Sequence, residues 1–178
     1  PIRGRSVGLS FADLYAAHIV DNDARNARIA SIARSETNAR RSALVLVEHI
    51  RHGEALVARI GTGAVMVSGA TGARETRQAV QAFAEGQRPC LVATAGLFQE
   101  GISIDGIHVL IQAGGLKSKA KTIQAIGRGM RRAPGKRACR YVDFFDDDRG
   151  GILRTHSRQR LGILREQGFT VPPLAEER

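Results

Sequence analysis

Two arginines and a glutamine recur at helical spacing between Gln124 and Arg132. At about 100° per residue, Gln124, Arg128 and Arg131 share one stripe of a helix, and the apolar residues of this stretch occupy another. Guanidinium groups are planar, permanently charged and suited to phosphate oxygens. The stripe therefore predicts phosphate binding or phosphate chemistry. The alternative interpretation is a solvated helix face, which is the usual state of arginines at this spacing.

Further polar and glycine residues follow short apolar runs that are predicted to be strands. In an open α/β sheet, ligands gather beyond the carboxyl ends of the strands. Glycines there permit close backbone approach, and helix N-termini present free N–H groups to anions. The residues concerned are Arg51, His52, Gly69, Gly72 and Thr94. They form a candidate phosphate-binding edge, although glycines after strands are also ordinary turn residues.

Several familiar catalytic patterns are missing from the chain. It has no G-x-x-x-x-G-K-[ST] loop and no following Asp-Glu pair for magnesium. The acidic run Asp146–Asp148 is interpreted as a solvated turn that caps the next helix. The histidines lack metal-ligand spacing, and no Ser/His/Asp or Cys/His set is found. The sequence thus predicts arginines for phosphate chemistry, without a nucleotide site of its own and without a metal site.

Composition narrows the class of protein. The 178 residues are 43% hydrophobic, enough for one well-buried domain. A formal charge of +10 indicates an anionic partner, most simply nucleic acid, and the absence of tryptophan argues against base stacking as the main contact. Cys90 and Cys139 are too few for a zinc site or disulfide framework. With no membrane-length apolar run or signal region, an intracellular, cytoplasmic location is expected.

Apolar runs and helical stretches alternate along the chain. Strands are predicted over 43–48, 65–68, 90–94, 107–111 and 140–145. Helices are predicted over 21–41, 51–60, 73–86, 118–132 and 150–167, the first capped by Asp21 or Asn22. This alternation predicts an α/β fold, with an open parallel sheet covered on both faces. The expected division is a linker arm and leading helix (1–40), a domain (41–148), and a basic helix with a tail (149–178).

The order of these segments resembles the second RecA-like domain of superfamily 2 helicases, over roughly residues 40–148. The run 43–52 resembles motif IV, and 69–77 resembles the nucleic-acid-facing turn and helix that follow it. Residues 92–102 resemble motif V. The pattern Gln124-x-x-Gly127-Arg128-x-x-Arg131 resembles motif VI, which is highly specific at this distance from motif V. The RecA-like fold and a helicase function are therefore expected.

A finer resemblance comes from shorter segments. Gly101-Ile-Ser103, Gly115–Lys119 and the motif VI residues resemble UvsW-type recombination and branch-migration helicases, which are phage-encoded. Many members of the superfamily carry Asp where this chain has Ser103. A hydroxyl can hydrogen-bond to a ribose but cannot pair with arginine. The resemblance places Gly101, Ser103 and Gly127 on the nucleotide side of the domain.

The resemblance also implies a role for the remaining motif residues. Arg131 would be the principal arginine finger, reaching ATP bound on a partner domain, and Arg128 would be the second phosphate contact. Gln124 would orient the nucleotide or couple the domains. Thr94, with the backbone around Gly69 and Gly72, would hold the phosphates of a nucleic-acid strand. Arg51 and His52 are further candidates for nucleic-acid contact.

Cofactors and partners follow from the same resemblance. ATP and Mg²⁺ would be held mainly by an N-terminal RecA-like domain of the same polypeptide, so the 178-residue chain alone is not expected to hydrolyse ATP. DNA is the expected nucleic acid, and RNA stays open because phosphate contacts do not read the 2′-hydroxyl. The alternative from another class is a non-catalytic, basic nucleic-acid-binding module.

Overall fold

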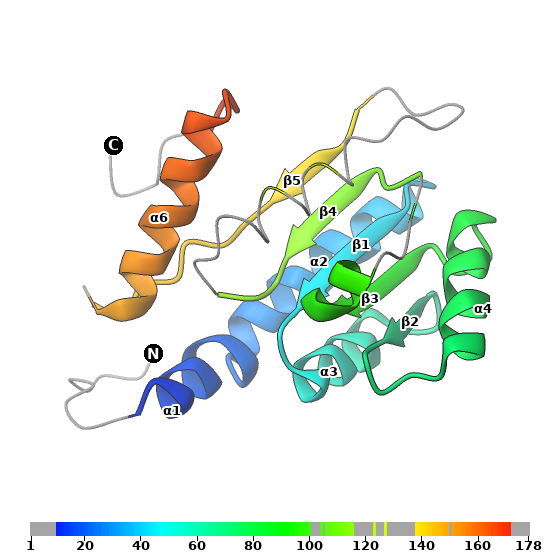
Figure 1. Cartoon of the computed structure of the whole chain (residues 1–178), viewed down its shortest axis with the longest axis horizontal. Coiled ribbons are helices and arrows are strands. Elements are labelled where there is room, and N and C mark those ends of the chain that lie inside the picture. The colour runs from blue at the N-terminus through cyan, green and yellow to red at the C-terminus, as the bar shows by residue number, and fades with distance from the viewer. Residues whose placement is uncertain are drawn as a thin grey trace.

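The computed structural model describes residues 10–100, 104, 106–115, 123, 127, 138–149 and 151–171. Five parallel strands form one sheet in the order β2-β3-β1-β4-β5 (Figure 1). The strands are β1 (Ala43–Val47), β2 (Ala64–Val67), β3 (Cys90–Thr94), β4 (Val109–Gln112) and β5 (Arg140–Val142). The helices are α1 (Phe11–Tyr15), η1 (Ala16–Val20), α2 (Asp23–Asn38), α3 (Ile50–Ile60), α4 (Ala73–Ala84), η2 (Ala95–Glu100) and α6 (Ile152–Glu166).

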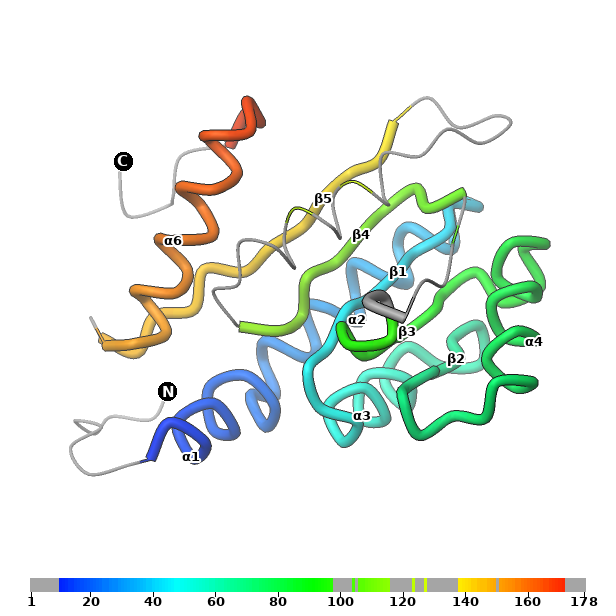
Figure 2. The backbone as a smooth tube through the Cα atoms, in the orientation of Figure 1, coloured from blue at the N-terminus to red at the C-terminus, as the bar shows by residue number. Residues whose placement is uncertain are grey.

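The central strand β1 shows why both faces of the sheet are covered. All five of its residues are buried, and successive side chains point to opposite faces. Val45 and Val47 pack in one core cluster with Ile29 of α2 and Leu56 of α3. Leu44 and Leu46 pack on the other face in a cluster that includes Phe83 of α4 and Leu97 of η2. Figure 2 shows α2 and α3 behind the sheet. The parallel order of the strands and the two core clusters confirm the predicted α/β fold with an open sheet covered on both faces.

The residues before the sheet are folded against it. Helix α2 begins after Asn22, whose side chain accepts a hydrogen bond from the Arg25 N–H at 3.1 Å, so the predicted Asn22 cap is confirmed. The stretch 10–20, expected to be part of a linker arm, forms α1 and η1. Tyr15 and Ile19 are buried there, in a cluster with Leu153 of α6. This leading segment therefore contributes to the packed structure.

Strand β5 ends three residues earlier than the sequence predicts. The expected strand reaches residue 145, whereas β5 spans Arg140–Val142. Beyond it, the backbone bonds to side chains: the Phe144 carbonyl accepts from Arg160 at 2.9 Å, and the Asp146 N–H donates to Ser157 at 2.9 Å. The backbone groups of these residues are thus directed to α6, which lies beside the β5 edge in Figure 1.

Among the described helices, none has the length and apolar character that crossing a lipid bilayer requires.

Candidate nucleic-acid interface

The predicted phosphate-binding residues after β2 and β3 lie at one edge of the sheet. The register pairs Val67 with Ala93 and Val47 with Thr94, so β1 and β3 end at the same level and β2 ends one residue earlier. Thr94 is the last residue of β3 and is half-buried. The turn 68–72 leaves β2 directly beside it. The carboxyl edge therefore brings a threonine hydroxyl next to a glycine-containing turn, as the sequence predicts.

The turn 68–72 is held by its own hydroxyl groups. The Ser68 N–H donates to Thr71 Oγ1 at 2.9 Å, and the Ala70 N–H donates to Ser68 Oγ at 3.2 Å. Gly69 and Gly72 are exposed, and a Cβ added at Gly69 would meet nothing within 4 Å. Gly72 is the N-cap of α4 and supplies no side-chain cap, so N–H groups of the first helical turn are left for water or an anion.

The two candidates after β1 behave differently from each other. Arg51 is exposed and forms a two-point ion pair with Asp21, at 2.8 and 3.1 Å. His52 is fully buried, and its Nε2 lies 2.9 Å from the Asn26 side-chain oxygen. The expectation that His52 contacts nucleic acid is therefore wrong, because neighbouring residues cover its ring. His52 lies on the buried face of α3, while Arg51 lies on its exposed face.

Burial also changes the acid–base behaviour of His52. The pKa falls from 6.5 to about 4, first because burial disfavours the imidazolium and then because Arg25, His49 and Arg51 add positive charge nearby. Asp21 opposes this shift. The amide of Asn26 donates to Val20, so its oxygen is the acceptor and His52 Nε2 carries the proton. His52 is a neutral structural residue at pH 7.

The predicted nucleotide-side residues are divided between the described and undescribed parts of the chain. Gln124, Arg128 and Arg131 lie outside the described residues, and so do Gly101 and Ser103. Of the predicted helix 118–132, the described residues are Ile123 and Gly127, and both are helical. Gly127 is exposed, with nothing within 4 Å of an added Cβ.

The acidic run after β5 is buried at two of its three positions. Asp148 accepts hydrogen bonds from the N–H groups of Leu153 and Arg154 at 3.3 and 3.2 Å, so it caps α6 as predicted. Asp146 forms a buried ion pair with Arg25, with 2.7 Å between its Oδ1 and the arginine Nε. The expectation of a solvated turn is therefore wrong for both aspartates. Their carboxylates satisfy a helix terminus and an arginine.

Two buried arginines, Arg25 and Arg160, are the polar residues that the sequence analysis missed. Their side chains are 5% and 1% exposed. Arg160 pairs with Asp143 at 2.8 Å. A signal was present: Arg160 lies seven residues after Leu153 and four before Leu164, and Arg25 lies four before Ile29. Each arginine therefore lies on the apolar stripe of its helix, where burial is expected.

In the Arg160–Asp143 pair, burial and the partner's charge shift each pKa in opposite directions. Burial raises the pKa of Asp143, and Arg160 opposes that shift with its charge and its hydrogen bond. For Arg160, burial lowers the pKa, but Asp143 and Asp146 more than offset it, so the net shift is upward. The 2.8 Å contact between Arg160 and Asp143 holds the two groups together in a buried site. The bond between Asp143 and Arg160 fixes the position of both side chains.

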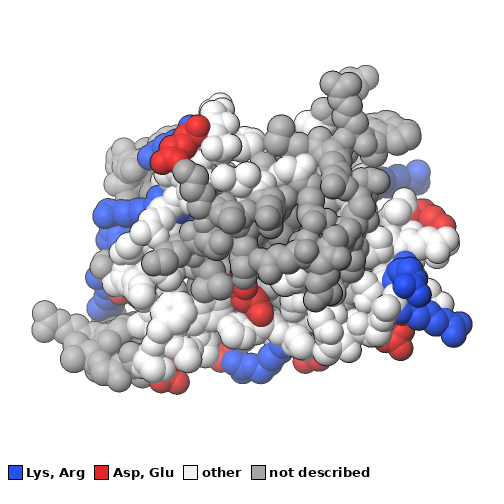
Figure 3. All heavy atoms as spheres, in the orientation of Figure 1, with Lys and Arg blue, Asp and Glu red and all other residues white. Residues whose placement is uncertain are grey.

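The described surface has mixed charge. On the face in Figure 3, Lys and Arg side chains lie along the margins, with Asp and Glu among them. No group of three or more His, Cys, Asp or Glu side chains in the described part of the chain is arranged to hold a metal ion.

Comparison with known proteins identifies a family. Residues 24–133 match the family described as "Helicase conserved C-terminal domain". The ATP-dependent DNA helicase uvsW of Enterobacteria phage T4 is 33% identical over 125 residues, which cover 68% of this chain and 25% of that protein. The DEAD-box ATP-dependent RNA helicase 5 of Oryza sativa subsp. japonica is 27% identical over 159 residues, covering 87% of this chain and 30% of that protein. This chain thus spans under a third of either relative.

The solved structures agree with the sequence comparison. The crystal structure of T4 UvsW superposes with a TM-score of 0.72 at 26% identity, over 90% of this chain and 36% of that one.

Proposed function

This chain belongs to the helicase conserved C-terminal domain family, and we propose that it is the C-terminal motor domain of an ATP-dependent DNA helicase or translocase. The observation that carries the proposal is the family match over residues 24–133, which includes the motif VI pattern. DNA is favoured because the identity to the phage DNA helicase, 33%, exceeds that to the rice RNA helicase, 27%. RNA is the alternative substrate.

In this proposal the motif VI arginines complete an ATP site on a preceding RecA-like domain. That domain holds most of the contacts to ATP and Mg²⁺. Arg131 stabilises the charge that develops on the transferring phosphoryl group, and Arg128 makes a second phosphate contact. Gln124 orients the nucleotide. Arginine fingers supply on the order of 10³–10⁵ in rate in enzymes of this chemistry.

The nucleotide side of the same domain includes Gly101, Ser103 and Gly127. Ser103 can donate a hydrogen bond to a ribose hydroxyl, but it has no charge with which to pair with an arginine. Lys117, Lys119 and Lys121 precede the arginines, and no acidic residue occurs between residues 116 and 137. This segment therefore has the charge expected of a surface that meets ATP or a nucleic-acid backbone.

The nucleic-acid strand is held at the carboxyl edge of the sheet. Thr94 offers a hydroxyl, and the backbone at Gly69 is open to a phosphate. Gly72 is also exposed, although the Glu75 carboxylate lies 3.7 Å from the position of a Cβ there. Arg51 is exposed and can contribute positive charge when it exchanges Asp21 for a phosphate. Opening and closing of the two domains with each ATP would then move the strand.

The decisive test is Arg131→Ala in a polypeptide that contains both RecA-like domains. ATP hydrolysis should fall by about 10³-fold or more, with nucleotide affinity mostly retained, because the finger acts on the transition state. Arg132→Ala is the matched control: it is the next residue, but a helix turns it about 100° away from the stripe. Parallel loss of affinity and hydrolysis would point to a structural role for Arg131 and contradict the proposal.

Two further measurements separate the alternatives. The 178-residue chain alone should show no appreciable ATP hydrolysis, and robust turnover would contradict the assignment of ATP binding to another domain. Stimulation of the two-domain polypeptide by RNA and not by DNA would select the RNA alternative. Nucleic-acid binding without any nucleotide dependence would select the non-catalytic binding module.

A further inference from the structure

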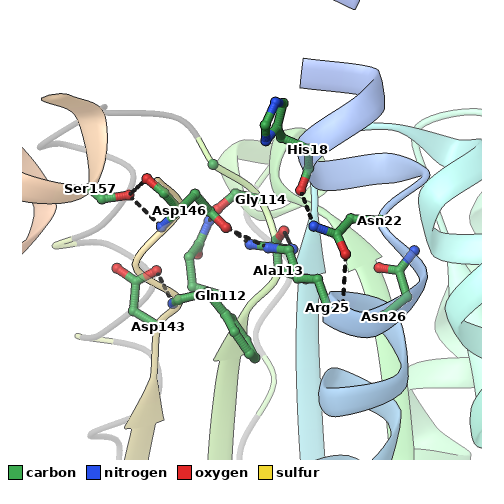
Figure 4. Close-up of polar contacts among 12 residues, drawn as sticks. His18, Asn22, Arg25, Asn26, Gln112, Ala113, Gly114, Asp143, Asp146 and Ser157 are labelled. Carbon is green, nitrogen blue, oxygen red and sulfur yellow. Dashed lines mark hydrogen bonds and ion pairs between the residues drawn. The ribbon is translucent and has the colours of Figure 1, made fainter. Parts of the chain in front are cut away.

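The turn that follows β4 is bound by side chains from three distant parts of the chain. The Arg25 Nη1 donates to the Ala113 carbonyl at 2.8 Å, from the first turn of α2 (Figure 4). The Gly115 N–H donates to the Tyr15 hydroxyl at 3.2 Å, and the Gly115 carbonyl accepts from Arg160 Nη1 at 3.0 Å. Two carbonyls and one N–H group of this turn are therefore bonded to buried side chains.

The arginine donors are themselves fixed. Arg25 bonds to both oxygens of Asp146, at 2.7 and 3.3 Å, and lies 4.9 Å from the centre of the Phe144 ring. Arg160 bonds to Asp143 at 2.8 Å and to the Phe144 carbonyl at 2.9 Å. Because each guanidinium is planar and held at several points, its remaining donor has one direction.

The turn is also fitted to the leading helices by shape. A Cβ added at Gly115 would lie 3.0 Å from Ile19 Cδ1 and 3.5 Å from Tyr15. Burial raises the pKa of the Tyr15 phenol to about 12, so the hydroxyl keeps its proton. The residues that precede the sheet therefore contact this turn through a hydrogen bond, a guanidinium and apolar atoms.

Charged groups in such a site are a costly way to build a core. Buried ion pairs are often no more stabilising than apolar residues of the same volume, because desolvation offsets their attraction. What the two arginines provide here is a defined position for two carbonyls, and Tyr15 does the same for one N–H group. The turn comes directly before the segment of the chain that carries Arg128 and Arg131. The position of the turn therefore bears on where that segment begins.

We propose that Tyr15, Arg25 and Arg160 are positioning residues, which fix the turn Ala113–Gly115 and thereby the origin of the segment carrying the motif VI arginines. This proposal rests on the proposed function. Tyr15 and Arg25 precede the sheet in the chain, so the same contacts link the entry of the domain to its ATP-directed segment. None of the three residues touches ATP; they act through the backbone of the turn.

The first experiment measures amide exchange in the 178-residue chain. Tyr15→Phe removes one hydroxyl and keeps the ring, so exchange of the Gly115 N–H should accelerate on the order of tenfold. The Ala113 N–H, which donates to the Leu46 carbonyl at 2.8 Å, should exchange as before. An unchanged Gly115 rate would overturn the proposal.

The second experiment measures ATP hydrolysis in the polypeptide with both RecA-like domains. Arg160→Met should lower kcat on the order of 10- to 100-fold with an unchanged KM for ATP, and Tyr15→Phe should give a smaller loss of the same kind. Arg41→Met is the control: its side chain is 49% exposed, and its partner Glu36 keeps Arg140. Unfolding of the Arg160 variant would leave Tyr15→Phe as the deciding variant.

The outcomes separate this proposal from the proposed function. If Arg131→Ala loses hydrolysis while Tyr15→Phe and Arg160→Met keep the kcat of the Arg41→Met control, the positioning role is overturned and the motor function stands. If Arg131→Ala keeps hydrolysis, the proposed function is overturned and this proposal falls with it. Loss of kcat together with faster Gly115 exchange supports both.

Discussion

Replacement of Arg25 by methionine tests whether the buried polar cluster contributes to folding stability. The variant removes the two-point ion pair with Asp146, the bond to the Ala113 carbonyl and the contact with the Phe144 ring. Methionine retains much of the apolar stem. The Asp146 side chain, which is 7% exposed in the structure, then has Arg160 as its next cation, at 3.7 Å.

The expected loss follows from that geometry. Removing one partner of a buried ion pair costs about 3–5 kcal/mol, since the other charge stays buried without compensation. Arg160 can approach Asp146, so the lower end, about 3 kcal/mol, is expected for Arg25→Met. The matched control is Arg51→Met, which breaks an ion pair of 65% and 51% exposed side chains and should cost less than about 1 kcal/mol.

The assay is equilibrium unfolding of the 178-residue chain in urea, with the free energy extrapolated to water. A double-mutant cycle of Arg25→Met and Asp146→Asn should give a coupling energy above about 1 kcal/mol, because the two groups bond directly. The reasoning is refuted if Arg25→Met costs no more than Arg51→Met. It is also refuted if the two changes in the cycle are additive.

Two further predictions concern His52 and Gly151. The unfolding free energy should fall by about 3 kcal/mol as pH drops from 6.5 to about 4, because unfolded His52 takes up a proton that the folded chain, with a pKa of about 4, excludes. His52→Gln should flatten that part of the pH–stability profile in urea titrations, and an equally steep profile would contradict this. Gly151→Ala should cost about 1–2 kcal/mol in the same assay, because its Cβ would displace the Asp148 carboxylate from the N-terminus of α6. Gly162→Ala, where a Cβ meets nothing within 4 Å, is the control and should not be destabilising.

The strands and their order of appearance could be predicted locally. Strand β3 matches its predicted bounds, Cys90–Thr94, and the other strands differ at their ends. Short apolar, β-branched runs between helical stretches are sufficient for this, because a strand buried on both faces needs apolar residues at every position. The Asn22 cap and the Asp148 cap were predictable for a different local reason: the N-terminus of a helix needs a hydrogen-bond acceptor within a few residues.

The candidate site was predicted in part. Thr94, Gly69 and Gly72 lie at the carboxyl edge of the sheet, as their positions after predicted strands indicate, and their contact with nucleic acid stays a prediction. The roles of Arg128 and Arg131 stay predictions, supported by the family and by helical Ile123 and Gly127. His52 was misassigned because it was grouped with Arg51 as a residue that follows the first strand. A one-residue step along a helix turns the side chain by about 100°, so Arg51 is exposed while His52 is buried.

By itself, the sequence determined the α/β class and the helicase family, and it named candidate residues for phosphate contact. Only the tertiary structure decided which partners the buried polar groups have. Arg25 and Asp146 are separated by 121 positions, and nothing local to either predicts that they meet. Their burial depends on how α2 and α6 dock beside the ends of β4 and β5. Local pattern reports the tendencies of a segment, whereas the partner of a buried charge is set by contacts between segments remote in the chain.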